Sequence, residues 1–148
     1  MADQPILDAR TARILPWVVA VAFFMQMLDG TILNTALPTM ARDLDANPLQ
    51  MQSVAIAYML TVAVIIPASG WLADKFGIRQ IFLFAIGLFT LGSLACGLSP
   101  TLEIIVACRV MQGVGGALLM ALSPALLTSA FPAAERGRAL GMNALSVA

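Results

Sequence analysis

The sequence predicts an all-α, polytopic membrane protein. Of its 148 residues, 60% are apolar and 11% are charged, and the mean hydropathy is +0.91. Soluble globular domains carry about 45–50% apolar and about 25% charged residues, so this composition does not fit a soluble domain. The apolar residues also fall into blocks of about 20 residues, the length that a helix needs to cross a bilayer.

The same composition excludes several functional classes. The chain has no histidine, and Cys96 and Cys108 fall in separate apolar blocks, so we expect neither a metal site nor a disulfide framework. Eight basic and eight acidic residues give no net charge and no basic run, which excludes a nucleic-acid partner. Without a histidine or a cluster of paired carboxylates, we do not expect an enzyme.

The first predicted span covers residues 14–37, after a short N-terminal segment, residues 1–13. Arg10 and Arg13 ahead of an apolar block are also typical of a signal peptide. Against that alternative, the apolar character continues beyond Asp29 and no small-residue cleavage site follows promptly. We therefore interpret this block as a membrane helix with one charge inside it.

Three further predicted spans cover residues 51–72, 81–98 and 103–129. Asn47, Pro48 and Gln50 predict a helix start before the second span, as N-cap, first helical residue and capping-box amide. Ser99 and Pro100 predict a similar start before the fourth span.

A fifth apolar block, residues 139–148, follows the charged stretch AAERGR and is about half a crossing long. A helix that stops inside hydrocarbon leaves carbonyl groups without partners. We therefore expect residues 14–148 to be a partial transmembrane bundle, the N-terminal piece of a longer protein.

The basic residues predict the orientation in the membrane. Arg42 alone falls on one side of the predicted spans, and six basic residues fall on the other: Arg10, Arg13, Lys75, Arg79, Arg136 and Arg138. Basic residues favour the cytoplasmic side, so we expect a multi-pass protein of the cell (inner) membrane with a cytoplasmic N-terminus.

Asp29 is the main candidate for chemistry. A charged residue near the middle of a span costs about 2.5–3.5 kcal/mol on insertion scales, so it needs a partner or a water-filled cavity. Burial disfavours the charged form of a carboxylate, which makes Asp29 a candidate for reversible proton binding. The alternative is a structural carboxylate in a permanent ion pair. Arg109 in the fourth span is the candidate counter-charge in either case.

Polar and small residues accompany these two charges. Gln112, Gly113 and Gly116 follow Arg109 on one helical face, where the glycines permit another backbone to approach. The candidates for a substrate cavity are Gln26, Thr31, Asn34 and Tyr58. Helix-packing hydrogen bonds are the alternative explanation for the threonine.

The turn after the second span, GWLADKFGIRQ, has the most specific pattern. Gly70 predicts a close helix approach, and Gly77 allows the chain to reverse. We expect Asp74 to accept hydrogen bonds at a helix end. Lys75 and Arg79 are expected to hold that acid in an ion network at the cytoplasmic face.

These motifs resemble those of the major facilitator superfamily of secondary transporters. GWLADKFGIRQ is similar to its signature between spans two and three, and RVMQGVGGA, which begins at Arg109, is similar to its span-four signature. LDGTILNTALP, which contains Asp29, is similar to the span-one motif of the fourteen-span drug:proton antiporter branch. The resemblance implies the first four spans, and the start of the fifth, of that family's N-terminal bundle.

The resemblance also implies a function, the export of lipophilic, often cationic drugs in exchange for protons. Asp29 would be the proton-responsive acid and Arg109 its coupling partner, with Asp74, Lys75 and Arg79 as a gate. The proton gradient drives such transport without a cofactor. The implied partners are the lipid bilayer, protons, a small lipophilic substrate and the C-terminal half of the protein.

Two alternatives stay open. A carrier of a metabolite or sugar would have the same features, because nothing in the first four spans fixes the substrate. A non-transporting membrane fragment that associates with another membrane protein would fit the incomplete fifth span. Four and a half helices lack the second wall of such transporters, so we expect the chain alone to be inactive.

Overall fold

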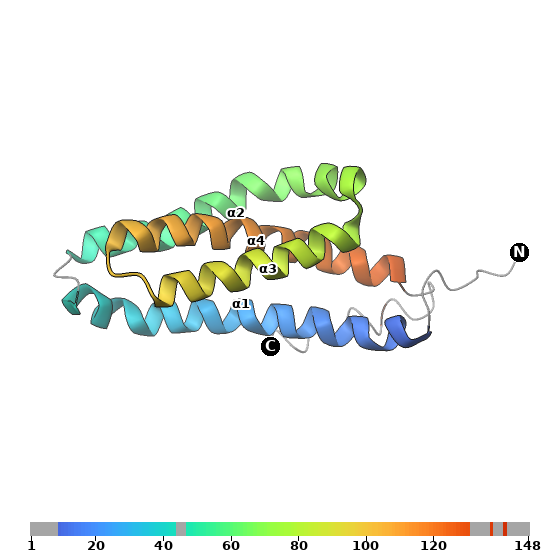
Figure 1. Ribbon diagram of the computed structural model, residues 1–148, viewed down its shortest axis with the longest axis horizontal. Coiled ribbons are helices and arrows are strands. Elements are labelled where there is room, and N and C mark those ends of the chain that lie inside the picture. Colours follow the sequence, from blue (N-terminus) through green and yellow to red (C-terminus); the bar gives the residue numbers. More distant parts are fainter. Residues whose placement is uncertain (1–8, 44–46, 131–136, 138–140, 142–148) are drawn as a thin grey trace, which may run out of the picture.

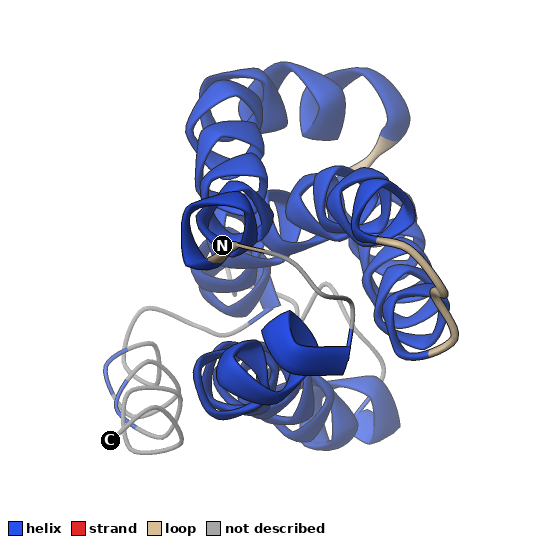
Figure 2. Ribbon diagram, turned by 90° about the vertical axis from the view of Figure 1, so that its left-hand side faces the viewer, coloured by secondary structure: helices blue, strands red, loops and turns tan. Residues whose placement is uncertain are grey.

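The computed structural model describes residues 9–43, 47–130, 137 and 141. The helices in this part of the chain are α1 (Ala9–Asp43), α2 (Pro48–Phe76), α3 (Ile78–Gly97) and α4 (Leu102–Ala130). They run alternately in opposite directions along one long axis (Figure 1), and the end-on view shows them grouped as a bundle rather than in one layer (Figure 2). Each contains a stretch long and apolar enough to cross a membrane, which confirms the predicted all-α membrane fold.

Most of the helices extend beyond the predicted spans. α1 begins at Ala9, inside the predicted N-terminal segment, and continues through Pro38 to Asp43. Polar helix ends outside the hydrocarbon keep their backbone hydrogen bonds but do not raise the hydropathy, so hydropathy alone underestimates helix length. The predicted fifth span, residues 139–148, lies outside the described residues except for residue 141.

The predicted start of α2 is confirmed. Asn47 Oδ1 accepts a hydrogen bond from the Leu49 backbone N–H at 3.1 Å, and Gln50 Oε1 accepts one from the Asn47 N–H at 2.9 Å. Pro48 occupies the first helical position, where a missing N–H costs nothing.

The predicted start of α4 at Ser99 and Pro100 is wrong. The helix begins at Leu102, and Thr101 Oγ1 accepts a weak hydrogen bond from the Ile104 N–H at 3.5 Å. The Ser99 hydroxyl donates instead to the carbonyl of Ala95 on α3, at 2.5 Å. Its hydroxyl therefore bonds to the end of α3, and Thr101 is the residue whose side chain contacts the first turn of α4.

α4 is the central helix of the bundle. In its most apolar stretch 56% of the residues are buried, against 11% in the corresponding stretches of α1 and α2. The larger core is formed by α1, α3 and α4, from the buried side chains Val19, Ala22, Ile81, Phe82, Ala85, Phe89, Leu118, Leu119, Leu122, Leu126 and Leu127.

Glycines on α4 bring the neighbouring helices close. A Cβ on Gly113 would lie 2.9 Å from the Cβ of Thr61 on α2. A Cβ on Gly115 would lie 2.8 Å from the backbone nitrogen of Phe89 and 2.9 Å from the carbonyl oxygen of Ala85, both on α3. Small residues allow this close packing in membranes, where van der Waals contact drives helix association.

Gly115→Ala is expected to lower the thermal unfolding temperature, because the new methyl group would collide with the α3 backbone and overpacking costs about 1–3 kcal/mol. Gly87→Ala on α3 is the matched control, since nothing lies within 4 Å of its added Cβ. The measurement is the unfolding temperature of both variants in the same detergent. Equal temperatures for the two variants would contradict this packing.

Candidate functional site

A buried ion pair joins α1 to α4 within the membrane-spanning part of the bundle. Arg109 Nη1 donates to Asp29 Oδ2 at 2.5 Å, and the two side chains are 7% and 13% exposed. Gln112 Nε2 donates to the other carboxylate oxygen, Oδ1, at 2.8 Å. The two charges that the sequence marks as candidates are therefore in direct contact, and both carboxylate oxygens are bonded to α4.

The buried Asp29 carboxylate depends on its partners from α4. The Arg109 guanidinium balances its charge, and Gln112 donates a further hydrogen bond to it. Breaking a buried pair by removing one partner costs about 3–5 kcal/mol, because a charge is left uncompensated. The contact between α1 and α4 therefore depends on this pair.

A second polar contact joins α1, α2 and α4. Gln26 Nε2 donates to the carbonyl oxygen of Gly116 at 2.8 Å. A Cβ on Gly116 would lie 2.6 Å from the hydroxyl oxygen of Tyr58 and 3.2 Å from Gln26 Nε2. The absent side chain of Gly116 thus lets groups from two other helices reach the α4 backbone.

A cavity of about 550 Å³ opens beside the ion pair, between α1, α3 and α4. Asp29 and Arg109 form part of its wall, and most of the rest is apolar, including Leu28, Phe89 and Ile105. Its volume lies within the range of about 300–1,000 Å³ that is typical of small-molecule pockets.

The four residues predicted to line a cavity are not in this wall. Thr31 and Asn34 are exposed on α1, and the Thr31 hydroxyl donates to the Met27 carbonyl of its own helix at 3.0 Å. Gln26 and Tyr58 lie at the contact around Gly116 described above. Whether any of the four contacts a substrate in the whole protein stays a prediction.

Part of the α1 face that lines the cavity was not predicted. It includes Ile32, Ala36 and Met40, which follow Asp29 at the helical spacing of three to four residues. This spacing from a buried charge was a usable signal. Its apolar members resemble the lipid-facing residues of the same helix, which explains the error.

The turn between α2 and α3 agrees only in part with its prediction. Gly77 has φ +87° and its N–H donates to the Ala73 carbonyl at 2.9 Å, so it ends α2 and reverses the chain as expected. Gly70 is exposed, and nothing lies within 4 Å of a Cβ placed on it. The predicted close helix approach at Gly70 is therefore wrong for the described bundle.

The predicted ion network in this turn does not form within the described residues. Asp74, Lys75 and Arg79 are all exposed. Lys75 Nζ lies 4.8 Å from the ring centroid of Trp71 and 5.3 Å from that of Phe76, where cation–π attraction holds it. The Lys75 ammonium lies over these two rings, and no ion pair joins it to Asp74 within the described residues. A gating role for this turn stays a prediction.

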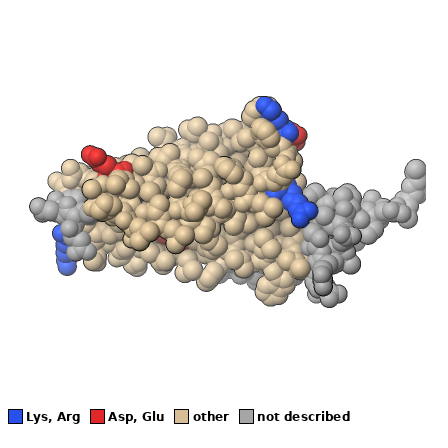
Figure 3. Space-filling model, in the orientation of Figure 1, with Lys and Arg blue, Asp and Glu red and all other residues tan. Residues whose placement is uncertain are grey.

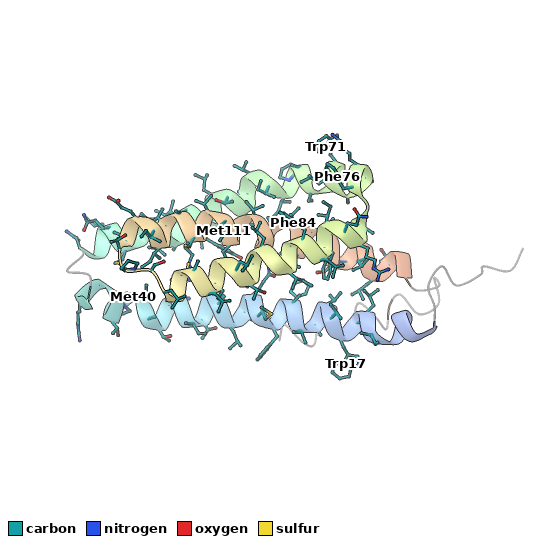
Figure 4. The ribbon with its side chains drawn as sticks, in the orientation of Figure 1. Trp17, Met40, Trp71, Phe76, Phe84 and Met111 are labelled. Carbon is teal, nitrogen blue, oxygen red and sulfur yellow. The ribbon has the colours of Figure 1, made fainter. Side chains whose placement is uncertain are left out.

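The ends of the bundle have the side chains that membrane interfaces favour. On the face in Figure 3, charged side chains gather mainly at the two ends of the described bundle. Trp17 and Trp71, 68% and 61% exposed, point outward near the same end (Figure 4). Tryptophan is enriched where the bilayer meets water, so this end lies at an interface.

A bundle of apolar helices that encloses an ion pair defines a polytopic membrane protein with a candidate functional site inside the bilayer. The sequence model of the Major Facilitator Superfamily matches residues 19–148, and the chain belongs to that family. This confirms the family to which its motifs pointed.

Relatives in two bacteria are similar to most of the chain. "Putative multidrug resistance protein MdtD" of Salmonella paratyphi B is 56% identical over 119 residues, which are 80% of this chain and 25% of the relative. The protein of the same name from Salmonella typhi is 54% identical over 129 residues, 87% of this chain and 27% of the relative. The chain thus spans about a quarter of the length of these relatives.

Asp29→Asn and Arg109→Gln are each expected to destabilise the bundle by about 3–5 kcal/mol, because each leaves one buried charge without a partner. The double variant is expected to recover most of this loss, since no buried charge remains. Thermal unfolding of the three variants in one detergent measures the effect. A double variant that loses as much stability as the two single variants together would contradict an energetic coupling between the two side chains.

Proposed function

We propose that the protein to which this chain belongs is a proton-coupled exporter of lipophilic, often cationic compounds. The observation that supports this most is the Asp29 carboxylate, which lies within a span, is paired with Arg109 and borders an apolar cavity. Transport of this kind changes no covalent bond in the substrate. It needs no cofactor, because the proton gradient supplies the driving force.

Proton binding at Asp29 is the proposed coupling step. In the paired form, the charged carboxylate accepts hydrogen bonds from Arg109 and Gln112. Protonation removes the negative charge, so the attraction that holds the arginine falls and a buried positive charge is left alone. A structure that separates α1 from α4 and gives Arg109 another environment is then favoured. The proton can shift this equilibrium only by the difference in its affinity for the two structures.

The packing supports α1 as the element that moves. α2 and α3 meet α4 through close contacts at Gly113 and Gly115, which do not depend on charge. α1 is hydrogen-bonded to α4 through Asp29 and Gln26. A change in the charge of Asp29 therefore acts on the α1–α4 contact first.

The cavity connects this movement to a substrate. Its walls come from α1 on one side and from α3 and α4 on the other, so a shift of α1 changes its shape. Leu28, Phe89 and Ile105 offer apolar surface to a lipophilic guest. Once Arg109 has withdrawn, release of the proton gives Asp29 a negative charge with which a cationic substrate can pair. The multidrug resistance named for the relatives supports the same substrate class.

We also infer a cytoplasmic N-terminus in the inner membrane. Lys75 and Arg79 are exposed at the α2–α3 turn, the end of the bundle at which α1 begins (Figure 1). Arg42 and the acidic Glu103 are exposed on helix turns at the opposite end. The excess of basic residues at the first end supports its assignment to the cytoplasm.

A second bundle is the proposed partner of this one. Transporters of this kind bind the substrate between two repeats and move one repeat against the other. The chain spans about a quarter of its relatives, so we propose that the rest of the protein supplies the other wall of the site.

Asp29→Asn is expected to reduce proton-driven efflux of a lipophilic cationic dye to the level of cells without the protein. The reason is that an amide side chain does not bind and release protons at physiological pH. The assay follows dye efflux from energised cells that express the full-length protein. Glu103→Gln is the matched control, an acid-to-amide change at an exposed position, and it is expected to keep full activity. Undiminished efflux by Asp29→Asn, at equal amounts in the membrane, would refute the coupling role.

A further inference from the structure

The α3–α4 hairpin has two thiols that the proposed transport cycle does not use. Cys96 on α3 lines the cavity, and Cys108 on α4 is buried. Both are free cysteines, and the sequence contains two cysteines in all.

Contacts between α3 and α4 place these two thiols at the same end of the helix pair. The Cys96 Sγ lies 3.9 Å from the carbonyl oxygen of Ile105, and the Cys108 Sγ lies 3.8 Å from the Ser99 hydroxyl oxygen. Cys108 follows Ile105 by one helical turn on α4, and Ser99 follows Cys96 by three residues at the end of α3. The two contacts therefore place both sulfur atoms between α3 and α4, where the hairpin closes.

The cavity gives a ligand access to this pair. Cys96 lines it directly, and so do Ser99 and Ile105, which lie next to Cys108. A small ligand that enters the cavity reaches the Cys96 sulfur first. The Cys108 sulfur lies next to Ser99, which belongs to the same wall.

The rest of the wall suits a soft, apolar ligand. The thioethers of Met25 and Met40 and the ring of Phe89 line the same cavity, and Figure 4 shows Met40 on α1 near the end at which the α3–α4 hairpin closes. Thioethers and thiols are polarizable groups that favour soft partners over hard, hydrated ions.

We propose that Cys96 and Cys108 form a two-thiol site for thiophilic compounds, with trivalent organoarsenicals as the ligand class. A monosubstituted arsenical in water has two hydroxyl groups on arsenic. Each thiol replaces one of them, so two As–S bonds form, two As–O bonds break, and each thiol proton leaves with a hydroxyl as water. Arsenic stays trivalent, and no oxidant or reductant takes part.

The test uses phenylarsine oxide and the full 148-residue chain in membranes. After exposure, the membranes are washed with an excess of a monothiol, and the intact mass of the purified chain is measured. The site predicts one phenylarsenic group per chain that survives this wash and is removed by a dithiol such as 2,3-dimercaptopropanol. A single thiol holds the arsenical too weakly to survive.

Cys96→Ser and Cys108→Ser are each expected to lose the retained group, and the corresponding alanine variants repeat the test without a new hydroxyl. Ser93→Ala, a change in the same cavity wall, is the control that keeps it. Absence of a retained group on the unmodified chain, or its presence on either cysteine variant, overturns the site. The readout is a mass and not transport, so the result is independent of the proposed export function.

Discussion

The ion pair between Asp29 and Arg109 is the constraint on which the rest of the bundle depends. Either charge alone inside a bilayer would be expensive, and each needs the other within hydrogen-bonding distance. Arg109 reaches Asp29 because α4 runs through the centre of the bundle, and Gln112 one turn later bonds to the second carboxylate oxygen. The position of α4 therefore follows from the need to bury these polar groups together.

The contacts of α4 are of two physical kinds. Toward α2 and α3 they are close steric contacts, made possible by the missing side chains of Gly113 and Gly115. Toward α1 they include an ion pair and hydrogen bonds. Within the described residues, Arg109 Nε and Gln112 Oε1 are buried without a hydrogen-bond partner. This unused capacity fits a pair that can rearrange, because buried polar groups in a fixed core are nearly always satisfied.

The cavity takes its properties from the same arrangement. It lies where α1 separates from α3 and α4, so it contains the ion pair on one side and an apolar wall on the other. The closure of the α3–α4 hairpin adds the Cys96 thiol to that wall, and the Cys108 thiol is buried, 3.8 Å from the Ser99 hydroxyl oxygen. A charge, an apolar surface and soft sulfur atoms are thus within reach of one small guest.

Much of this fold could be predicted from the sequence, because block length and hydropathy report directly on the bilayer. The start of α2 could also be predicted, since Asn47 and Gln50 bond only to nearby residues.

The cavity wall could not be predicted in the same way. α1 is apolar on most sides, and tertiary packing decides which of these sides faces the other helices. The predicted ion network in the α2–α3 turn was also wrong, because side-chain packing decided the partner of Lys75. Asp74 and Lys75 are neighbours in sequence, but the aromatic rings of Trp71 and Phe76 hold the lysine.

The distance between α1 and α4 in the full-length protein tests the central claim most directly. Spin labels that replace Arg42 and Glu103, both exposed, report on α1 and α4, and a second pair at Leu49 and Glu103 reports on α2 and α4. If the charge of Asp29 holds α1 against α4, Asp29→Asn increases the first distance and leaves the second unchanged. An unchanged Arg42–Glu103 distance would contradict the claim that this carboxylate links proton binding to helix movement.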